Sequence, residues 1–221
     1  MILIMLGAPG TGKGTVASKL SEKLGIPQVS TGDIFRKAIA EKTPVGIEAE
    51  KYISQGMLVP DETTIRIVEE RLKDADVQNG LILDGFPRTV NQARVLDEML
   101  TKEGKKIDIV VNLETPEEEI LERIVNRRIC SNSECKTIYN TVLNPSKVDG
   151  VCDKCGAALY QRDDDKLEKA KNRLEVYHRE TAPVADYYKE TGALYSTVLS
   201  QAVNRMKNEV AADVIEYLKN K

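Results

Sequence analysis

The sequence predicts an α/β fold in which a parallel β-sheet is flanked by helices. Short apolar runs that end in glycine or aspartate alternate along the chain with longer amphipathic stretches. This alternation is typical of strand–helix–strand units, whose strands run parallel. A further stretch, residues 129–162, holds all four cysteines and has little helical periodicity. It predicts a separate, small, β-rich lobe.

Five apolar runs have the length and composition of buried parallel strands. They cover residues 2–6, 27–30, 81–84, 109–113 and 193–198. The first run stops at Gly7, and the third ends in Asp84. Because ligands bind beyond the carboxyl ends of parallel strands, these two residues mark the edge where we expect the functional site.

The segments between these runs carry apolar residues at helical spacing. We expect helices over residues 14–24, 33–41, 45–54, 61–72, 91–100, 163–188 and 201–218. One more helix is expected after Thr115, which stands as an N-cap before Pro116 and a pair of glutamates.

The composition excludes several classes of protein. The 221 residues are 41% hydrophobic and 30% charged, with a net charge of -3, which predicts a soluble globular chain without a nucleic-acid-binding face.

The apolar start is too short for a signal peptide or a membrane span, so we expect a cytoplasmic protein. A monomer is expected because no apolar surface stripe is left over. His178 is the only histidine, and no recognisable nucleophile site surrounds it.

A glycine-rich loop follows the first strand and opens the first helix. It reads Gly7-Ala-Pro-Gly-Thr-Gly12-Lys13-Gly14-Thr15. Backbone N–H groups of such a loop, the helix N-terminus and the lysine bind phosphates, so the loop predicts nucleotide binding. Gly14 stands where the general pattern has a magnesium-binding Ser or Thr, which leaves Thr15 as a poorer substitute.

The four cysteines form two pairs sixteen residues apart, Cys130 with Cys135 and Cys152 with Cys155. Thiolates at such spacings surround a tetrahedral zinc, and four sulfurs leave no open position, so the role is structural. A lobe this small needs the folding energy that a metal supplies. Two disulfides, unligated thiols or an iron site with the same ligands remain alternatives.

Six arginines stand near the boundaries of these motifs, and planar guanidinium groups suit phosphate oxygens and phosphoryl transfer. They are Arg36, Arg88, Arg123, Arg127, Arg162 and Arg173. Four further motifs follow the loop in order: Ser30-Thr31-Gly32-Asp33, Leu83-Asp84-Gly85-Phe86-Pro87-Arg88-Thr89 with Gln92, Arg123-Ile-Val-Asn-Arg127-Arg128 and Gln161-Arg162-Asp163-Asp164. Together with the loop, these ordered motifs resemble those of adenylate kinases from end to end. Some members of that family carry a four-cysteine lid; the first cysteine pair here has four intervening residues instead of the usual two.

The resemblance implies an ATP site and a catalytic group. The ATP site would comprise Gly10, Thr11, Gly12, Lys13, Gly14, Thr15, Arg123 and Arg127. Arg123 would lie against the adenine, and Asp84 would orient the waters around Mg²⁺. Lys13, Asp84, Arg88, Arg127, Arg162 and Arg173 would be the catalytic residues. Asp164 and Asp165 would help to latch the lobe when it closes.

The resemblance also implies an AMP site and a division into lobes. The AMP site would comprise Thr31, Arg36, Met57, Leu58, Val59, Gly85, Arg88, Gln92, Arg162 and Arg173. Gln92 would read the adenine edge. The core would be residues 1–29, 60–126 and 165–221, with an AMP-binding insertion at 30–59 and the zinc lid at 127–164. The expected reaction is ATP + AMP to 2 ADP with Mg²⁺; another nucleoside monophosphate kinase, or a non-catalytic ATP-binding switch, remains an alternative.

Overall fold

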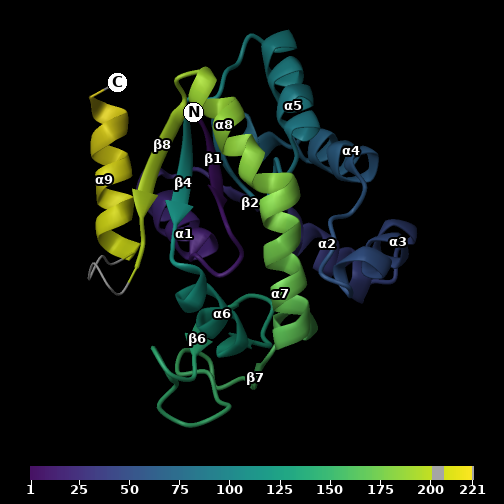
Figure 1. Cartoon of the computed structure of the whole chain (residues 1–221), viewed down its shortest axis with the longest axis vertical. Helices are drawn as coiled ribbons and strands as arrows, with labels where there is room; N and C mark the ends of the chain where they lie inside the picture. The colour runs from purple at the N-terminus through teal and green to yellow at the C-terminus, as the bar shows by residue number, and fades with distance from the viewer. Residues whose placement is uncertain (201–206, 221) are drawn as a thin grey trace.

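The computed structural model describes residues 1–200 and 207–220, and its centre is a five-stranded parallel sheet (Figure 1). The strand order is β2-β3-β1-β4-β8, with β1 (Ile2–Gly7), β2 (Gln28–Ser30), β3 (Leu81–Asp84), β4 (Ile109–Glu114) and β8 (Leu194–Val198). All five predicted strands are confirmed to within one residue at each end. Met5 of β1 pairs with Asp84 of β3, so the carboxyl ends of these two strands lie side by side.

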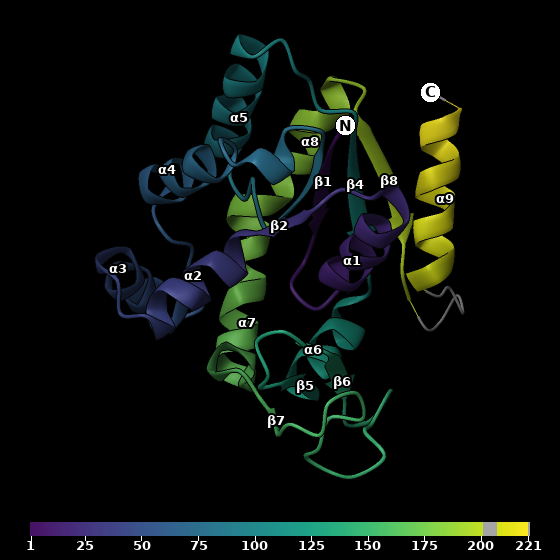
Figure 2. The same cartoon turned by 180° about the vertical axis from the view of Figure 1, so that it is seen from behind.

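Helices cover both faces of the sheet. They are α1 (Lys13–Leu24) and α9 (Lys207–Lys219) on one face, and α4 (Asp61–Arg71), α5 (Val90–Lys102) and α8 (Ala182–Glu190) on the other. Figure 2 shows α1 in front of the sheet, opposite the face that α8 covers in Figure 1. Each face has its own apolar cluster: Leu20 and Val214 are fully buried in one, and Val68 and Leu96 in the other. The predicted α/β fold is thus confirmed.

A small helical lobe lies between β2 and α4. It holds α2 (Thr31–Ala40) and α3 (Pro44–Ile53), which project away from the sheet (Figure 2). The Ser30 hydroxyl caps α2 by accepting from an N–H of its first turn. The two helices approach so closely that a Cβ at Gly46 would lie 2.1 Å from the carbonyl oxygen of Ala38. Phe35 and Ala49 form a separate core within the lobe.

The cysteine-containing stretch forms a second lobe at the other end of the molecule. Helix α6 (Glu117–Val125) leads into an antiparallel sheet of β5 (Arg127–Cys130), β6 (Ile138–Asn140) and β7 (Leu159–Tyr160). The core of this lobe is small: Cys130, Tyr139 and Cys152 are its fully buried members. The prediction of a small β-rich lobe is confirmed.

The prediction of one helix over residues 163–188 is wrong. The segment comprises a 3-10 turn (Asp163–Asp165), α7 (Leu167–Val176), a π-helical turn (Tyr177–Thr181) and α8. Pro183 accounts for the interruption, because it has no N–H to donate and its ring blocks the carbonyl four residues before it. The chain therefore widens locally, and Ala182 donates its N–H to the carbonyl of Tyr177 instead.

Two further expectations concern helix ends. Thr115 is not the N-cap of α6; its hydroxyl instead donates to the carbonyl of Leu199 at 2.6 Å, and Pro116 occupies the cap position. The predicted beginning of the last helix at Gln201 lies outside the described residues, within which α9 extends from Lys207. Among the helices in the described part of the chain, none is both long and apolar enough to cross a membrane.

Candidate active site

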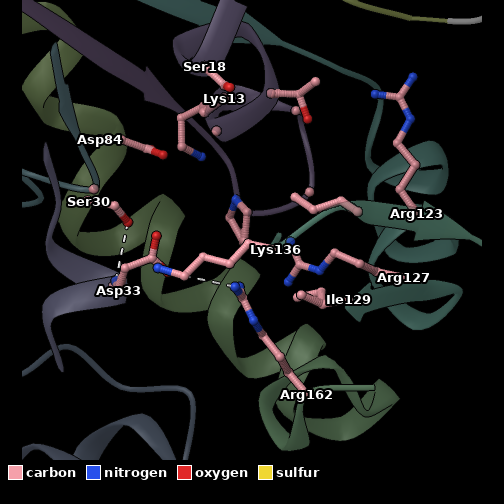
Figure 3. Close-up of a pocket in the computed structure, with 18 of the residues that line it drawn as sticks. Lys13, Ser18, Ser30, Asp33, Asp84, Arg123, Arg127, Ile129, Lys136 and Arg162 are labelled. Atoms are coloured by element: carbon pink, nitrogen blue, oxygen red, sulfur yellow. Dashed lines mark hydrogen bonds and ion pairs between the residues drawn. The ribbon is translucent and has the colours of Figure 1, made fainter. Parts of the chain in front are cut away.

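The predicted site residues gather around one cavity at the carboxyl edge of the sheet. It has a volume of about 1930 Å³ and is bounded by the glycine-rich loop, by α2, by the loop after β3 and by the cysteine lobe. Figure 3 shows Lys13, Asp84, Arg127 and Arg162 pointing toward this space from different elements. The three parts of the chain that sequence analysis assigned to different lobes therefore face one another.

The glycine-rich loop is shaped by close backbone contacts. A Cβ at Gly7 would lie 2.3 Å from the carbonyl oxygen of Leu113, and Gly7, Gly10 and Gly12 all have φ between 86° and 130°. These conformations favour glycine. The buried Thr11 hydroxyl donates to the carbonyl of Ala8 at 2.9 Å, so it holds the loop itself. The loop leads directly into α1, which begins at Lys13, and the N-terminus of this helix faces the cavity.

Lys13 and Asp84 form the floor of the cavity. The ammonium of Lys13 donates to the carbonyls of Gly7 and Ala8 at 2.6 and 2.7 Å. Burial lowers the pKa of Lys13 to about 7, although the carboxylate of Asp84 acts in the opposite direction. A Cβ at Gly14 would lie 3.2 Å from Asp84 Oδ2. The unusual glycine after the lysine thus leaves room for this carboxylate.

Four partly buried arginines, Arg88, Arg127, Arg162 and Arg173, line the same cavity as Lys13. Burial lowers the pKa of Arg88 and of Arg162 to about 10, and it also lowers the pKa of Arg173. Neighbouring cations lower these pKa values further: Arg173 acts on Arg88, and Arg127 acts on Arg162. Such crowding of buried positive charge costs free energy, and a bound polyanion offsets it.

One donor in this cluster has no partner. Arg162 Nε is buried and makes no hydrogen bond within the described residues, although the side chain reaches the cavity. Buried polar groups are nearly always paired, so an orphaned guanidinium donor indicates a place for an acceptor. Phosphate oxygens are the acceptors that match a guanidinium fork.

The carboxylate of Asp165 is fully buried and holds two of the arginines. It accepts from Arg127 Nε at 2.8 Å and forms an ion pair with Arg173 at 3.2 Å. Burial acts to lower the pKa of Arg127, but the hydrogen bonds that Arg127 donates to Asp165, with the negative charge of that carboxylate, outweigh it and the net shift is upward. Asp164 pairs with Arg173 at 3.0 Å. The two aspartates therefore fix the directions of the arginine side chains.

Four of the residues predicted for the AMP site line the cavity in α2 and in the loops that follow α3 and β3. They are Arg36, Leu58, Gly85 and Arg88. Arg36 is paired with Asp33 at 2.5 Å, and Arg162 of the lid lies 3.9 Å from the same carboxylate. Burial alone would raise the pKa of Asp33, but Arg36, Arg162 and Lys136 together lower it.

Arg162 and Arg173, which were also predicted for that site, line the cavity as well. The remaining four predicted residues lie outside its lining. Val59 belongs to the core of the helical lobe, and Met57 is 43% exposed. Thr31 is 2% exposed and donates its hydroxyl to the carbonyl of Gly85 at 2.7 Å. Gln92 is 1% exposed and is bonded on both sides of its amide. Their contact with a nucleotide stays a prediction.

Arg123 lies at the far side of the cavity, on α6. It donates to Glu119 at 2.7 Å and to the carbonyl of Leu199 at 3.4 Å. Lys207 lies near it: burial lowers the pKa of Lys207, and Arg123 and Lys19 add to that effect. The sequence motifs did not single out Lys207.

Two charged residues at the cavity had no role in the sequence analysis. Asp33 belongs to one of the motifs quoted from the sequence. Its ion pairs with Arg36 and Arg162, however, are seen only in the structure. Lys136 follows a cysteine in the lid, has φ of 45°, and points toward Asp33 in Figure 3. The electrostatic interaction, which lowers the pKa of Asp33, joins residues about a hundred positions apart, and no pattern of spacing could have predicted it.

The four cysteine sulfurs lie within 4.8 Å of one another. Cys130 and Cys155 are 3.3 Å apart, and Cys135 and Cys152 are 3.7 Å apart, both far beyond the length of a disulfide bond. All four thiols are free. Zinc–sulfur bonds of about 2.3 Å in a tetrahedron place the sulfurs about 3.8 Å apart, so the donor set fits such an ion.

The longer first cysteine pair is accommodated by a turn. The N–H of Cys135 donates to the carbonyl of Asn132 at 3.1 Å, and the N–H of Glu134 donates to the Asn132 side chain at 2.9 Å. The extra residues thus fold back, and the Cys135 sulfur returns to the cluster. Tyr139 lies beside it, with its hydroxyl 3.6 Å from the Cys152 sulfur.

Comparison with known proteins decides the family. A sequence profile described as "Adenylate kinase" matches residues 5–193, which is most of the chain. The chain belongs to the adenylate kinase family. It is therefore a phosphotransferase, and the predicted family, fold class and enzyme class are confirmed.

Individual relatives of the adenylate kinase family agree over the full length. A protein of Archaeoglobus fulgidus named adenylate kinase is 50% identical over 220 residues, covering 100% of both chains. One of Caldicellulosiruptor bescii is 53% identical over 194 residues, 88% of this chain and 89% of that protein. One of Streptomyces coelicolor is 47% identical over 219 residues, 99% of each chain. The similarity thus includes the central sheet with its helices, the helical lobe and the cysteine-containing lobe.

Proposed function

We propose that the chain transfers a phosphoryl group reversibly between Mg·ATP and AMP, giving two ADP. The observation that carries this proposal is the convergence of five partly buried cations on one cavity from separate elements. They are Lys13, Arg88, Arg127, Arg162 and Arg173. Phosphoryl transfer needs positioning and charge stabilisation more than covalent chemistry, and this cluster supplies both.

ATP would bind through the glycine-rich loop. The loop amides, the N-terminus of α1 and Lys13 would hold its phosphates. Arg123 would lie on the face of its adenine as a planar cation. Magnesium, when bound with ATP, neutralises charge on the phosphates; Asp84, through water, and Thr15 are the residues that would hold it. The geometry around Gly14 fits this assignment, because the carboxylate of Asp84 reaches that position.

AMP would bind between the helical lobe and the loop after β3. Arg36 and Arg88 would hold its phosphate, and Gln92 would read its adenine. An oxygen of that phosphate would attack the γ-phosphorus of ATP in line, while the bond from this phosphorus to the β-phosphate oxygen breaks. Both products are then ADP, and the developing negative charge lies among Arg127, Arg162 and Arg173.

Lid closure would complete the site. We assign residues 127–164 to the lid, 30–59 to the AMP-binding lobe and the remainder to the core. Arg127 and Arg162 lie at the two ends of the lid, so chemistry would wait until it shuts and excludes water. Asp33 of the AMP-binding lobe, which faces Arg162 at 3.9 Å, would help to hold the closed form.

A structural zinc would hold the lid together. Cys130, Cys135, Cys152 and Cys155 would be its ligands, and their free thiols and mutual distances support this assignment. Thiols that persist in the free form suit a reducing compartment. We propose that the enzyme acts as a monomer in the cytoplasm.

Transfer of phosphate from Mg·ATP to AMP, GMP, CMP and UMP tests the proposed reaction. We expect ADP to form with AMP far faster than with the other three. Faster transfer to another monophosphate would show that the protein is a phosphotransferase whose preferred acceptor is not AMP. Absence of transfer to all four, with ATP still bound, would contradict the proposal and favour a nucleotide switch.

A further inference from the structure

The carboxylate of Asp61, the first residue of α4, binds a segment at the start of α5. It accepts from the Thr89 hydroxyl and the Asn91 amide at 2.9 Å each, and from Gln92 Nε2 at 2.7 Å. Helices α4 and α5 lie side by side in both overall views (Figures 1 and 2). One carboxylate at the exit of the helical lobe thus holds three polar side chains within a segment of four residues.

These contacts are not those of a helix cap. The N-cap position of α4 is Pro60, and no side chain caps the helix. A capping aspartate would accept from N–H groups of its own helix. Asp61 instead directs both carboxylate oxygens toward the segment between Thr89 and Gln92. The carboxylate of Asp61 therefore holds the segment between Thr89 and Gln92 in place and does not cap α4.

The amide of Gln92 is held with a defined polarity. Its Oε1 accepts the backbone N–H of Arg88 at 2.7 Å, and its Nε2 donates to Asp61. An N–H can only donate and an ionised carboxylate can only accept, so neither partner tolerates a flipped amide. The side chain is also 1% exposed, which leaves little room to rotate. One Nε2 hydrogen and one Oε1 lone pair remain for another partner.

We propose that Asp61 is a positioning residue that sets the acceptor specificity of the enzyme for a 6-aminopurine. The proposal rests on the proposed function, in which Gln92 reads the base of the acceptor nucleotide. A locked amide offers an acceptor beside a donor. Adenine presents a matching 6-amino donor and N1 acceptor, whereas a 6-oxopurine presents an acceptor and an N1 donor, so both contacts would be mismatched.

The test compares AMP with inosine monophosphate, which differs from AMP only at that edge of the base. The ratio of the two kcat/KM values is measured for the wild type, for Asp61→Asn and for Asn91→Ala, with KM for ATP and Tm recorded for each. Asp61→Asn replaces an obligate acceptor by an amide that can also donate. Asn91→Ala removes one of the three bonds to Asp61 but keeps the Asp61 carboxylate, Gln92 and the hydrogen bond between them.

Asp61→Asn is expected to lower the AMP-to-inosine monophosphate ratio by about fivefold or more, because a good bidentate pair discriminates by roughly 5- to 150-fold and the Arg88 N–H still restrains the amide. KM for ATP stays within about twofold, and Asn91→Ala keeps the wild-type ratio. Asp61→Glu retains a carboxylate acceptor, so this variant is expected to keep most of the wild-type ratio of AMP to inosine monophosphate. Should Asp61→Asn not fold, Asp61→Ser gives the same test, since its hydroxyl can also donate.

An unchanged ratio would overturn the proposal, even if both rates fell, since it would give Asp61 a structural role only. The same holds if Asn91→Ala lowers the ratio as far as Asp61→Asn does. These outcomes are distinct from failure of the proposed function. In that case the wild type itself would not transfer phosphate to AMP.

Discussion

Replacing Arg88 by alanine is expected to lower kcat/KM for AMP by about 100-fold to 1000-fold, the loss typical of one preorganised donor to a developing charge. Arg88 is partly buried near Arg173 and Asp84, and desolvation lowers its pKa to about 10. Its Nε donates to the carbonyl of Gly85 at 2.9 Å. KM for ATP is expected to change little, because the glycine-rich loop, and not this side chain, would hold the phosphates of ATP. Steady-state kinetics with each substrate varied in turn measures the two effects separately.

Two companion variants sharpen this prediction. Arg94 lies six residues after Arg88, on an exposed face of α5. Arg94→Ala therefore removes a nearby arginine that does not line the cavity, and it is expected to leave both KM values unchanged. Arg88→Lys keeps the charge but loses the paired donors, so it is expected to recover only part of the activity. A large rise in KM for ATP with an unaltered AMP response would contradict the assignment of Arg88 to the acceptor.

Removal of the metal is expected to unfold the lid while leaving the core folded. The lid core consists mainly of the cysteine side chains and Tyr139, and structural zinc contributes ~10 kcal/mol or more to folding in small metal-dependent domains. We therefore expect near-stoichiometric zinc in the purified protein. Cys152→Ser should abolish zinc retention, lower hydrogen-exchange protection in residues 127–164 by more than about 100-fold, and remove most of the transfer activity.

The control for this prediction is Ser133→Ala in the same exposed turn as the first cysteine pair, which is expected to retain zinc and activity. Readdition of zinc after chelation should restore the lid in the wild type but not in Cys152→Ser. A metal-free protein with full activity and unchanged stability would show that the thiols are not a structural metal site. Iron in place of zinc would keep the structural role but change the ion.

The parts of the fold that were predicted correctly depend on local chemistry. Residues 2–7 form a strand because the run is apolar throughout and buried on both faces of the sheet. The loop that follows was recognisable because its glycines and Lys13 stand between a strand and a helix. The cysteine cluster was predictable for a similar reason: four thiols within 26 residues have few other uses in a reducing compartment.

The errors came from interactions between distant parts of the chain. Thr115 has the sequence of a cap, but its hydroxyl binds a carbonyl 84 residues away. The turn at residues 177–181 has a local cause instead, a proline within an otherwise uninterrupted helical pattern. The pairing of the fully buried Asp165 with Arg127, 38 residues away, could not be predicted from the sequence. Asp61 carried no signal at all, since its partners are on another helix.

Binding of an inhibitor in which two adenosines are joined by a chain of phosphates tests the central claim most directly, namely that one cavity holds two nucleotides at once. Calorimetry is expected to give one molecule bound per chain, with an affinity at least about 100-fold tighter than that of ATP, because the second contact becomes intramolecular. Arg88→Ala should lose most of this gain while its affinity for ATP is retained. An affinity no greater than that of ATP in the wild type would contradict the account, because it would leave the cavity with a single nucleotide site.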